Sequence, residues 1–236
     1  MKVSFFEEFP NKENLSKLRL VKWNSTIYIA SPSLKAFLKL TNPLKKKYKS
    51  RFDYVWWPVL KKEEGYWISV FSDEIALFRV YEEIKRAEEK EIKVMLDLEL
   101  PFGWNKRLFS FFSNRKIFNE MLKTENTITC EYPIPNFLDF LRNKNLKAKE
   151  RIKMCYSEIA LKLLGKSFAK KGMSIGLGCI ATGIYGDEKT ISPGKLERQM
   201  RLCRKWGCKE IILFRLGGLN EKYASEIKKV YIPEKH

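Results

Sequence analysis

Histidine is almost missing from this sequence of 236 residues, because the only one is His236. Its scarcity excludes a histidine base, a Ser-His-Asp triad and a metal site built on imidazole ligands. Carboxylate chemistry, lysine chemistry and oxygen-ligated Mg²⁺ remain. No two of the five cysteines form a CxxC pair, and we interpret them as free, buried thiols in a reducing compartment. They are Cys130, Cys155, Cys179, Cys203 and Cys208.

Long apolar runs are also missing. No stretch approaches the roughly 18 apolar residues of a membrane span. Residues 1–8 carry charge too early for the core of a signal peptide. We therefore expect a cytoplasmic protein without a membrane partner. Hydrophobic residues make up 44% of the chain, which predicts a folded core rather than disorder.

Acidic residues are few beside basic ones, with 28 Asp and Glu against 46 Lys and Arg, for a net charge of +18. One interpretation is an anionic partner, such as nucleic acid or a sugar phosphate. The other is the lysine-rich surface of a heat-adapted protein, which fits the presence of a single glutamine, Gln199. Both interpretations stay open.

Short β-rich runs alternate with longer stretches of helical period. The expected strands are residues 2–6, 26–30, 52–57, 92–99, 127–131, 174–178 and 210–215. The expected helices are residues 11–20, 34–40, 43–49, 72–90, 104–123, 136–141, 148–171, 193–208 and 220–230.

Residues 66–71 alternate like an eighth strand, yet they follow the third strand after only a short turn. They are either a strand that has lost its preceding helix or a long loop.

The alternation of strands with helices along the chain predicts parallel strands with right-handed crossovers. We expect one domain over residues 1–236, a (β/α)8 TIM barrel of seven or eight parallel strands. An open doubly wound sheet is the alternative, but it would gather polar residues at one switch point.

Carboxylates follow several of these strands. In residues 93–99 the apolar side chains suit the helix-facing side, so Asp97 and Glu99 are expected to point inward. By the same argument Glu131 points inward from the neighbouring strand. Like charges at such distances raise one another's pKa, so that one group can act as an acid and another as a base or nucleophile. The alternative is structural pairing of Asp97 and Glu131 with Lys93 or Arg215.

Other side chains are expected near the same end of the barrel. Glu8 follows the first strand, with Glu7 as its immediate alternative, and Arg215 ends the last strand. Aromatic rings can stack on sugar faces or simply fill a core. The candidates for a sugar site are Trp57, Tyr66 and Tyr132.

Glycines near the last two strands suggest a different ligand. Barrels often bind phosphate with the loops that follow these strands. Gly178, Gly217 and Gly218 are the candidates, although ordinary tight turns also need glycine. In this alternative Asp97, Glu99 and Glu131 would hold Mg²⁺.

The segment Leu96-Asp97-Leu98-Glu99 resembles the Asp-x-Glu strand end of glycoside hydrolase barrels, including the lysozyme-like ones. The resemblance covers this short segment and the inferred fold. It implies Glu99 as catalytic acid and Asp97 as stabiliser of an oxocarbenium-like centre, without a cofactor, and it leaves the role of Glu131 open. The sequence thus favours a glycosidase-like hydrolase. The alternatives are a Mg²⁺-dependent enzyme of a phosphorylated metabolite and a basic nucleic-acid-binding protein.

Overall fold

The computed structural model describes residues 1–99, 110–133 and 150–231. In this part of the chain, eight parallel strands form a closed barrel in sequence order. The strands are β1 Lys2–Glu7, β2 Ser25–Ser31, β3 Phe52–Pro58, β4 Val94–Leu98, β5 Thr127–Glu131, β6 Glu150–Cys155, β7 Ser174–Cys179 and β8 Glu210–Phe214. The α/β barrel expected from the alternation of strands and helices is confirmed.

Described helices follow β1 to β4 and β6 to β8. They are α1 Lys12–Ser16, α2 Leu34–Tyr48, α3 Glu74–Glu88, α4 Ser110–Met121, α5 Glu158–Ala160, α6 Lys166–Lys170, α7 Pro193–Lys205 and α8 Glu221–Val230. A π-helical turn, η6 Leu161–Gly165, joins α5 to α6, and a 3-10 turn, η7 Leu216–Gly218, precedes α8. Within the three described ranges, no helix combines the length and the apolar character that crossing a membrane requires.

Strand β6 differs from the sequence-based expectation, which placed residues 148–171 in one helix. Charged side chains alternate with apolar ones here, and they resembled the solvent side of a helix. In the structure Glu150 stays exposed, but the Arg151 side chain is only 17% exposed. Lys153 is fully buried, and its ammonium group lies 5.5 Å from the centre of the Phe168 ring. The helical segment begins only at Glu158, where the Ser157 side chain caps it.

Residues 66–71 are not a strand, so the loop alternative is confirmed. Tyr66 has a φ of 64°, which breaks any extended run. The loop returns to the helical layer at Asp73, whose side chain accepts the backbone N–H of Ala76 at the start of α3. Strand β3 is therefore followed by a helix, α3. The helix expected at 136–141 and the first part of the one expected at 104–123 lie outside the described residues.

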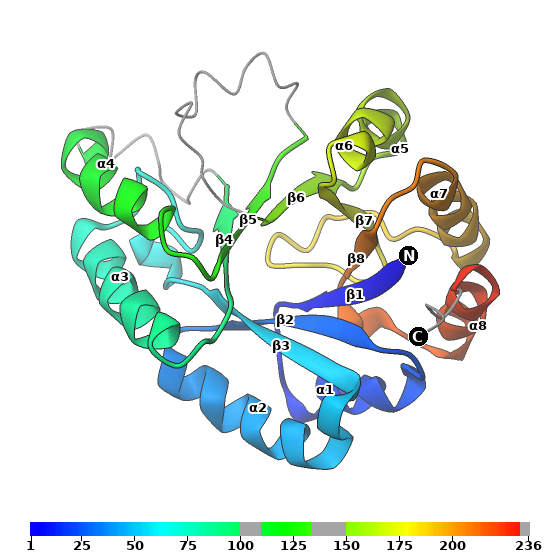
Figure 1. Ribbon diagram of the computed structural model, residues 1–236, viewed down its shortest axis with the longest axis horizontal. Coiled ribbons are helices and arrows are strands. Elements are labelled where there is room, and N and C mark those ends of the chain that lie inside the picture. Colours follow the sequence, from blue (N-terminus) through cyan, green and yellow to red (C-terminus); the bar gives the residue numbers. More distant parts are fainter. Residues whose placement is uncertain (100–109, 134–149, 232–236) are drawn as a thin grey trace. The chain divides into compact units, whose positions relative to one another are not determined.

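The chain divides into two compact units. Unit 1 comprises Met1–Ile29, Asn42–Tyr54 and Ile152–His236, and unit 2 comprises Ala30–Thr41 and Val55–Arg151. In unit 1, β7, β8 and β1 lie side by side, and α7 and α8 lie next to each other (Figure 1). In unit 2, β4 pairs with β5, and α3 lies against α4. The single domain expected over residues 1–236 stays a prediction.

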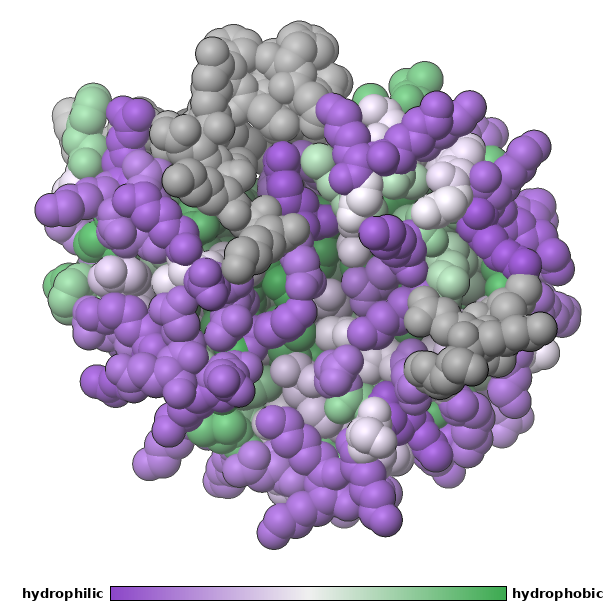
Figure 2. All heavy atoms as spheres, in the orientation of Figure 1, coloured by the Kyte–Doolittle hydropathy of each residue, from purple (hydrophilic) through white to green (hydrophobic). Residues whose placement is uncertain are grey.

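Hydrophilic residues cover most of the face in Figure 2, as a chain with 31% charged residues requires.

All five cysteines are free and buried, which confirms their interpretation as buried thiols. Burial raises the pKa of Cys155 and of Cys179 to about 12. Because the thiolate is the reactive form, both side chains are chemically inert in the folded protein.

Candidate functional site

The register between β4 and β5 determines which carboxylates share a face. Asp97 lies opposite Cys130, and Leu98 lies opposite Glu131. Paired residues of neighbouring strands point to the same side, while successive residues point to opposite sides. Asp97 and Glu131 therefore lie on opposite faces of the sheet. The expectation that Glu131 converges with Asp97 and Glu99 is wrong.

Glu131 lies on the face that meets the helices. Thr127, four residues earlier on the same face, donates a hydrogen bond of 3.2 Å to the carbonyl oxygen of Met121 at the end of α4. Ile128 and Cys130 consequently point to the barrel interior. The sequence argument assumed that apolar residues must face the helices. Barrel strands are buried on both faces, so apolar side chains fit either one.

The Glu131 carboxylate is fully buried and paired with Arg151 of β6. Nε of Arg151 donates to Oε1 at 3.0 Å, and Nη2 donates to Oε2 at 2.7 Å. The Thr129 hydroxyl donates to Oε1 as well, at 2.7 Å. This bidentate pairing gives Glu131 a structural role. Sequence analysis considered such a role with Lys93 or Arg215 as partner, and it missed Arg151 because β6 was interpreted as a helix.

Asp97 points to the interior at the carboxyl end of β4, and Glu99 directly follows that strand. The Tyr132 hydroxyl donates to Glu99 Oε2 at 2.7 Å. Asp97 is buried, whereas Tyr132 is 39% exposed. Burial raises the pKa of Cys130 well above its usual value, and the negative charges of Asp97, Glu99 and Glu131 raise it further. Asp97 lies opposite Cys130 in the strand register and is therefore a direct neighbour of this thiol.

In unit 1, Glu7 rather than Glu8 meets Arg215. Glu7 is fully buried, and Arg215 Nη1 donates to its Oε1 at 3.3 Å. The backbone N–H of Gly217 donates to Oε2 at 2.6 Å, and Asn14 Nδ2 donates to Oε1 at 3.1 Å. Burial raises the pKa of Glu7 despite these contacts. The donors expected to hold phosphate, Arg215 and Gly217, are therefore already engaged by an internal carboxylate.

The other two glycines of the phosphate alternative have packing roles. Gly178 has a φ of 60°, and a β-carbon there would overlap the Ile191 side chain. At Gly218 a β-carbon would overlap the backbone carbonyl of Ile180. Both positions need glycine because neighbouring atoms leave no room for a side chain.

Glu8 has a different neighbour, Glu188 in the loop between β7 and α7. A β-carbon built at Gly183 would lie 2.8 Å from each of three atoms: Glu8 Oε2, Glu188 Oε1 and Phe214 Cζ. Glu188 Oε2 also accepts the backbone N–H of Gly183 at 3.0 Å. Two carboxylates therefore lie beside one aromatic ring in unit 1. Sequence reasoning selected Glu8 and missed Glu188, because residues in an irregular loop have no periodicity to reveal their direction.

The aromatic candidates divide by exposure. Trp57 and Tyr66 are buried, so both rings are part of the hydrophobic core and offer no surface to a sugar in this structure. Tyr132 retains enough exposed surface to meet a ligand.

The chain offers little support for the expected Mg²⁺ ligands. In the described ranges, no group of three or more His, Cys, Asp or Glu side chains could hold a metal ion. The register between β4 and β5 explains why Asp97 and Glu131 cannot bind the same metal ion, because the two carboxylates lie on opposite faces of the sheet.

The fold and these side chains define a class, an α/β barrel with carboxylates at the carboxyl ends of its strands. No protein-family model matches the chain, and no curated protein matches it. The resemblance to glycoside hydrolases thus depends on Asp97, Glu99 and the fold.

Proposed function

We propose that this protein hydrolyses glycosidic bonds with Glu99 and Asp97 as the reacting carboxylates. The observation that carries the proposal is the hydrogen bond from the exposed Tyr132 to Glu99, next to the buried Asp97 on the interior face of β4. Enzymes with this fold place their catalytic groups at the carboxyl ends of the strands.

Each side chain has a distinct task in the proposed reaction. Glu99 protonates the oxygen of the leaving sugar as its bond to the anomeric carbon breaks, while the ionised Asp97 stabilises the positive charge on that carbon. A water molecule then attacks the anomeric carbon and gives a proton back to Glu99. Two carboxylates two residues apart on one strand are separated by about 6.5 Å along it. Neighbouring carboxylates do not ionise independently, which allows one to keep its proton.

Tyr132 serves two purposes in this proposal. Its hydroxyl fixes the orientation of the Glu99 carboxyl group, and its exposed ring offers a face on which a sugar can stack. The net charge of +18 favours an anionic saccharide, because a positive field attracts such a ligand.

The test is turnover of a panel of fluorogenic aryl glycosides by the whole protein. Glu99→Gln removes the acid, and we expect kcat/KM to fall by about 10²–10⁴-fold, the usual contribution of general acid catalysis. Asp97→Asn should also reduce turnover. The matched control is Glu89→Gln, which alters an exposed carboxylate at the end of α3 and should change nothing.

Thermal unfolding of each variant separates loss of chemistry from loss of fold. Full turnover by a folded Glu99→Gln variant would show that Glu99 is not the acid. Absence of turnover by the wild-type protein across neutral and anionic glycosides would remove the proposal altogether.

The phosphorylated-metabolite alternative has less support. Its phosphate donors Arg215 and Gly217 contact Glu7, which occupies the place of the anion.

A further inference from the structure

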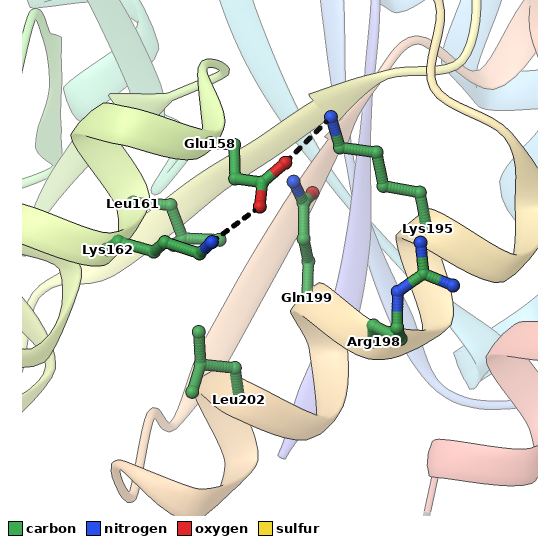
Figure 3. A pocket seen from close by; sticks show the side chains of 7 residues that line it. All are labelled: Glu158, Leu161, Lys162, Lys195, Arg198, Gln199 and Leu202. Atoms are coloured by element: carbon green, nitrogen blue, oxygen red, sulfur yellow. Dashed lines mark ion pairs between the residues drawn. The ribbon is translucent and has the colours of Figure 1, made fainter.

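A cavity of about 220 Å³ lies in the helical layer of unit 1, between the α5–η6 segment and α7 (Figure 3). That volume has room for roughly seven water molecules or one small organic molecule, at about 30 Å³ per water. Its wall consists of Glu158, Leu161, Lys162, Lys195, Arg198, Gln199 and Leu202. None of these residues takes part in the proposed hydrolysis.

Gln199 is the unusual member of this wall, and it is the only glutamine of the chain. It is 6% exposed, and both Oε1 and Nε2 are buried without a hydrogen-bond partner among the described residues. Figure 3 shows its amide reaching from α7 toward the space between Glu158 and Lys195. Buried amides nearly always have hydrogen-bond partners, so we expect the Gln199 amide to bond to a molecule inside the cavity.

The charges of the wall are unbalanced. Glu158 accepts hydrogen bonds from both Lys162 and Lys195, which lower its pKa to about 2 and keep it ionised. Arg198 makes no ion pair or hydrogen bond with any residue that the structure describes. The wall therefore carries three cations and one carboxylate, and the guanidinium group of Arg198 has no counter-ion among the described residues.

We propose that this cavity binds a small molecule through an oxyanion group, a carboxylate or a phosphate. The planar guanidinium of Arg198 can donate two parallel hydrogen bonds to such a group, and Lys195 adds a second positive charge. The Gln199 amide completes the site by donating to one ligand oxygen and accepting from a ligand hydroxyl or a bound water. Leu161 and Leu202 provide an apolar surface for the rest of the molecule.

The experiment uses the single glutamine as a reporter. Protein labelled with ¹⁵N only at the glutamine side-chain amide gives one pair of NMR signals, which belong to Gln199. Inorganic phosphate and malonate are the two probes. We expect saturable shifts of these signals with at least one of them; a preference for phosphate or for malonate identifies which oxyanion the site takes.

Variants at the rim of the cavity make the test specific. Arg198→Ala should weaken binding by about tenfold or more, as expected for loss of a charge-assisted pair. Arg201→Ala is the matched control on the same helix, since Arg201 pairs with Glu197 at 2.6 Å and does not line the cavity. Gln199→Leu removes the reporter, so isothermal titration calorimetry with the same anions measures its binding, which should be weaker as well.

Three results would overturn the proposal. The Gln199 signals could stay unchanged at tens of millimolar of both anions, which would mean that only buried water occupies the cavity. They could shift without saturation, or Arg201→Ala could weaken binding as much as Arg198→Ala does, and either result would indicate general charge screening.

Discussion

The guanidinium group of Arg151 holds both carboxylate oxygens of the buried Glu131, at 3.0 Å and 2.7 Å. This pair joins β6 to β5 on the helix-facing side, while Asp97 points to the interior. The relationship removes Glu131 from the proposed catalytic group. It also identifies a position at which the fold depends on one cation.

Arg151→Ala should destabilise the protein, because it leaves the Glu131 carboxylate buried without its counter-ion. Breaking a buried pair costs about 3–5 kcal/mol, and we expect the lower end because the Arg151 side chain is 17% exposed. Urea unfolding measures the loss. The control is Lys93→Ala, which breaks an exposed pair with Glu150 and should cost less than about 1 kcal/mol. Equal losses in the two variants would contradict the structural role of Glu131.

Tyr132→Phe should lower kcat on the best glycoside substrate by about tenfold or more, because the hydroxyl stabilises the carboxylate that Glu99 becomes as it donates its proton. Hydrogen bonds to charged groups contribute about 1.5–3 kcal/mol. The unfolding free energy should change by less than about 1 kcal/mol, since Tyr132 is partly exposed. Tyr81→Phe on α3 provides the control for losing a phenol hydroxyl elsewhere. An unchanged kcat for Tyr132→Phe would mean that this hydroxyl does not position Glu99.

The stability of the protein should depend on pH through Glu7. Burial raises the pKa of Glu7 above 4.5 in the folded protein, so the native state binds more protons than the unfolded chain between the two pKa values. The contribution of Glu7 to stability is therefore complete below pH 4.5 and is lost as the pH rises through its folded pKa.

Glu7→Gln removes this titration. The unfolding free energy of the wild type, relative to that of the variant, should decline as the pH rises above 4.5, by at most about 1.4 kcal/mol per pH unit. Denaturant titrations at successive pH values provide the measurement, with Glu89→Gln as the control that keeps the wild-type dependence. A constant difference between wild type and Glu7→Gln would show that Glu7 titrates normally.

Gly218→Ala should destabilise unit 1, since the new methyl group would overlap the backbone carbonyl of Ile180. Backbone atoms cannot move aside as side chains do, and overpacking typically costs about 1–3 kcal/mol. Gly194→Ala in α7 is the matched control, because the nearest atom to its new methyl lies 3.9 Å away. We expect that variant to be as stable as the wild type or slightly more stable. Tolerance of Gly218→Ala in urea unfolding would contradict the packing of this turn.

The sequence was sufficient to predict the kind of architecture, although it missed the strand β6. Alternating strand and helix periods predicted a parallel α/β barrel, and residues 127–131 and 2–6 were expected as strands close to the observed β5 and β1. Local hydrophobic periodicity determines such elements, so one chain contains the information. The same periodicity predicted that Asp97 and Glu99 share a face at the end of β4.

Only the tertiary structure decided the partners of the buried charges. The position of Glu131 depends on the register of β5 against β4, and its neutralisation depends on Arg151, in a strand whose charged residues resembled a helix surface. The neighbours Glu8 and Glu188 come from distant segments, as do Glu158 and Lys195. The sequence by itself thus determined the kind of fold and most of its strands and helices, but not β6. Ion pairs and cavities depend on which distant side chains meet, and that is set by packing rather than by local pattern.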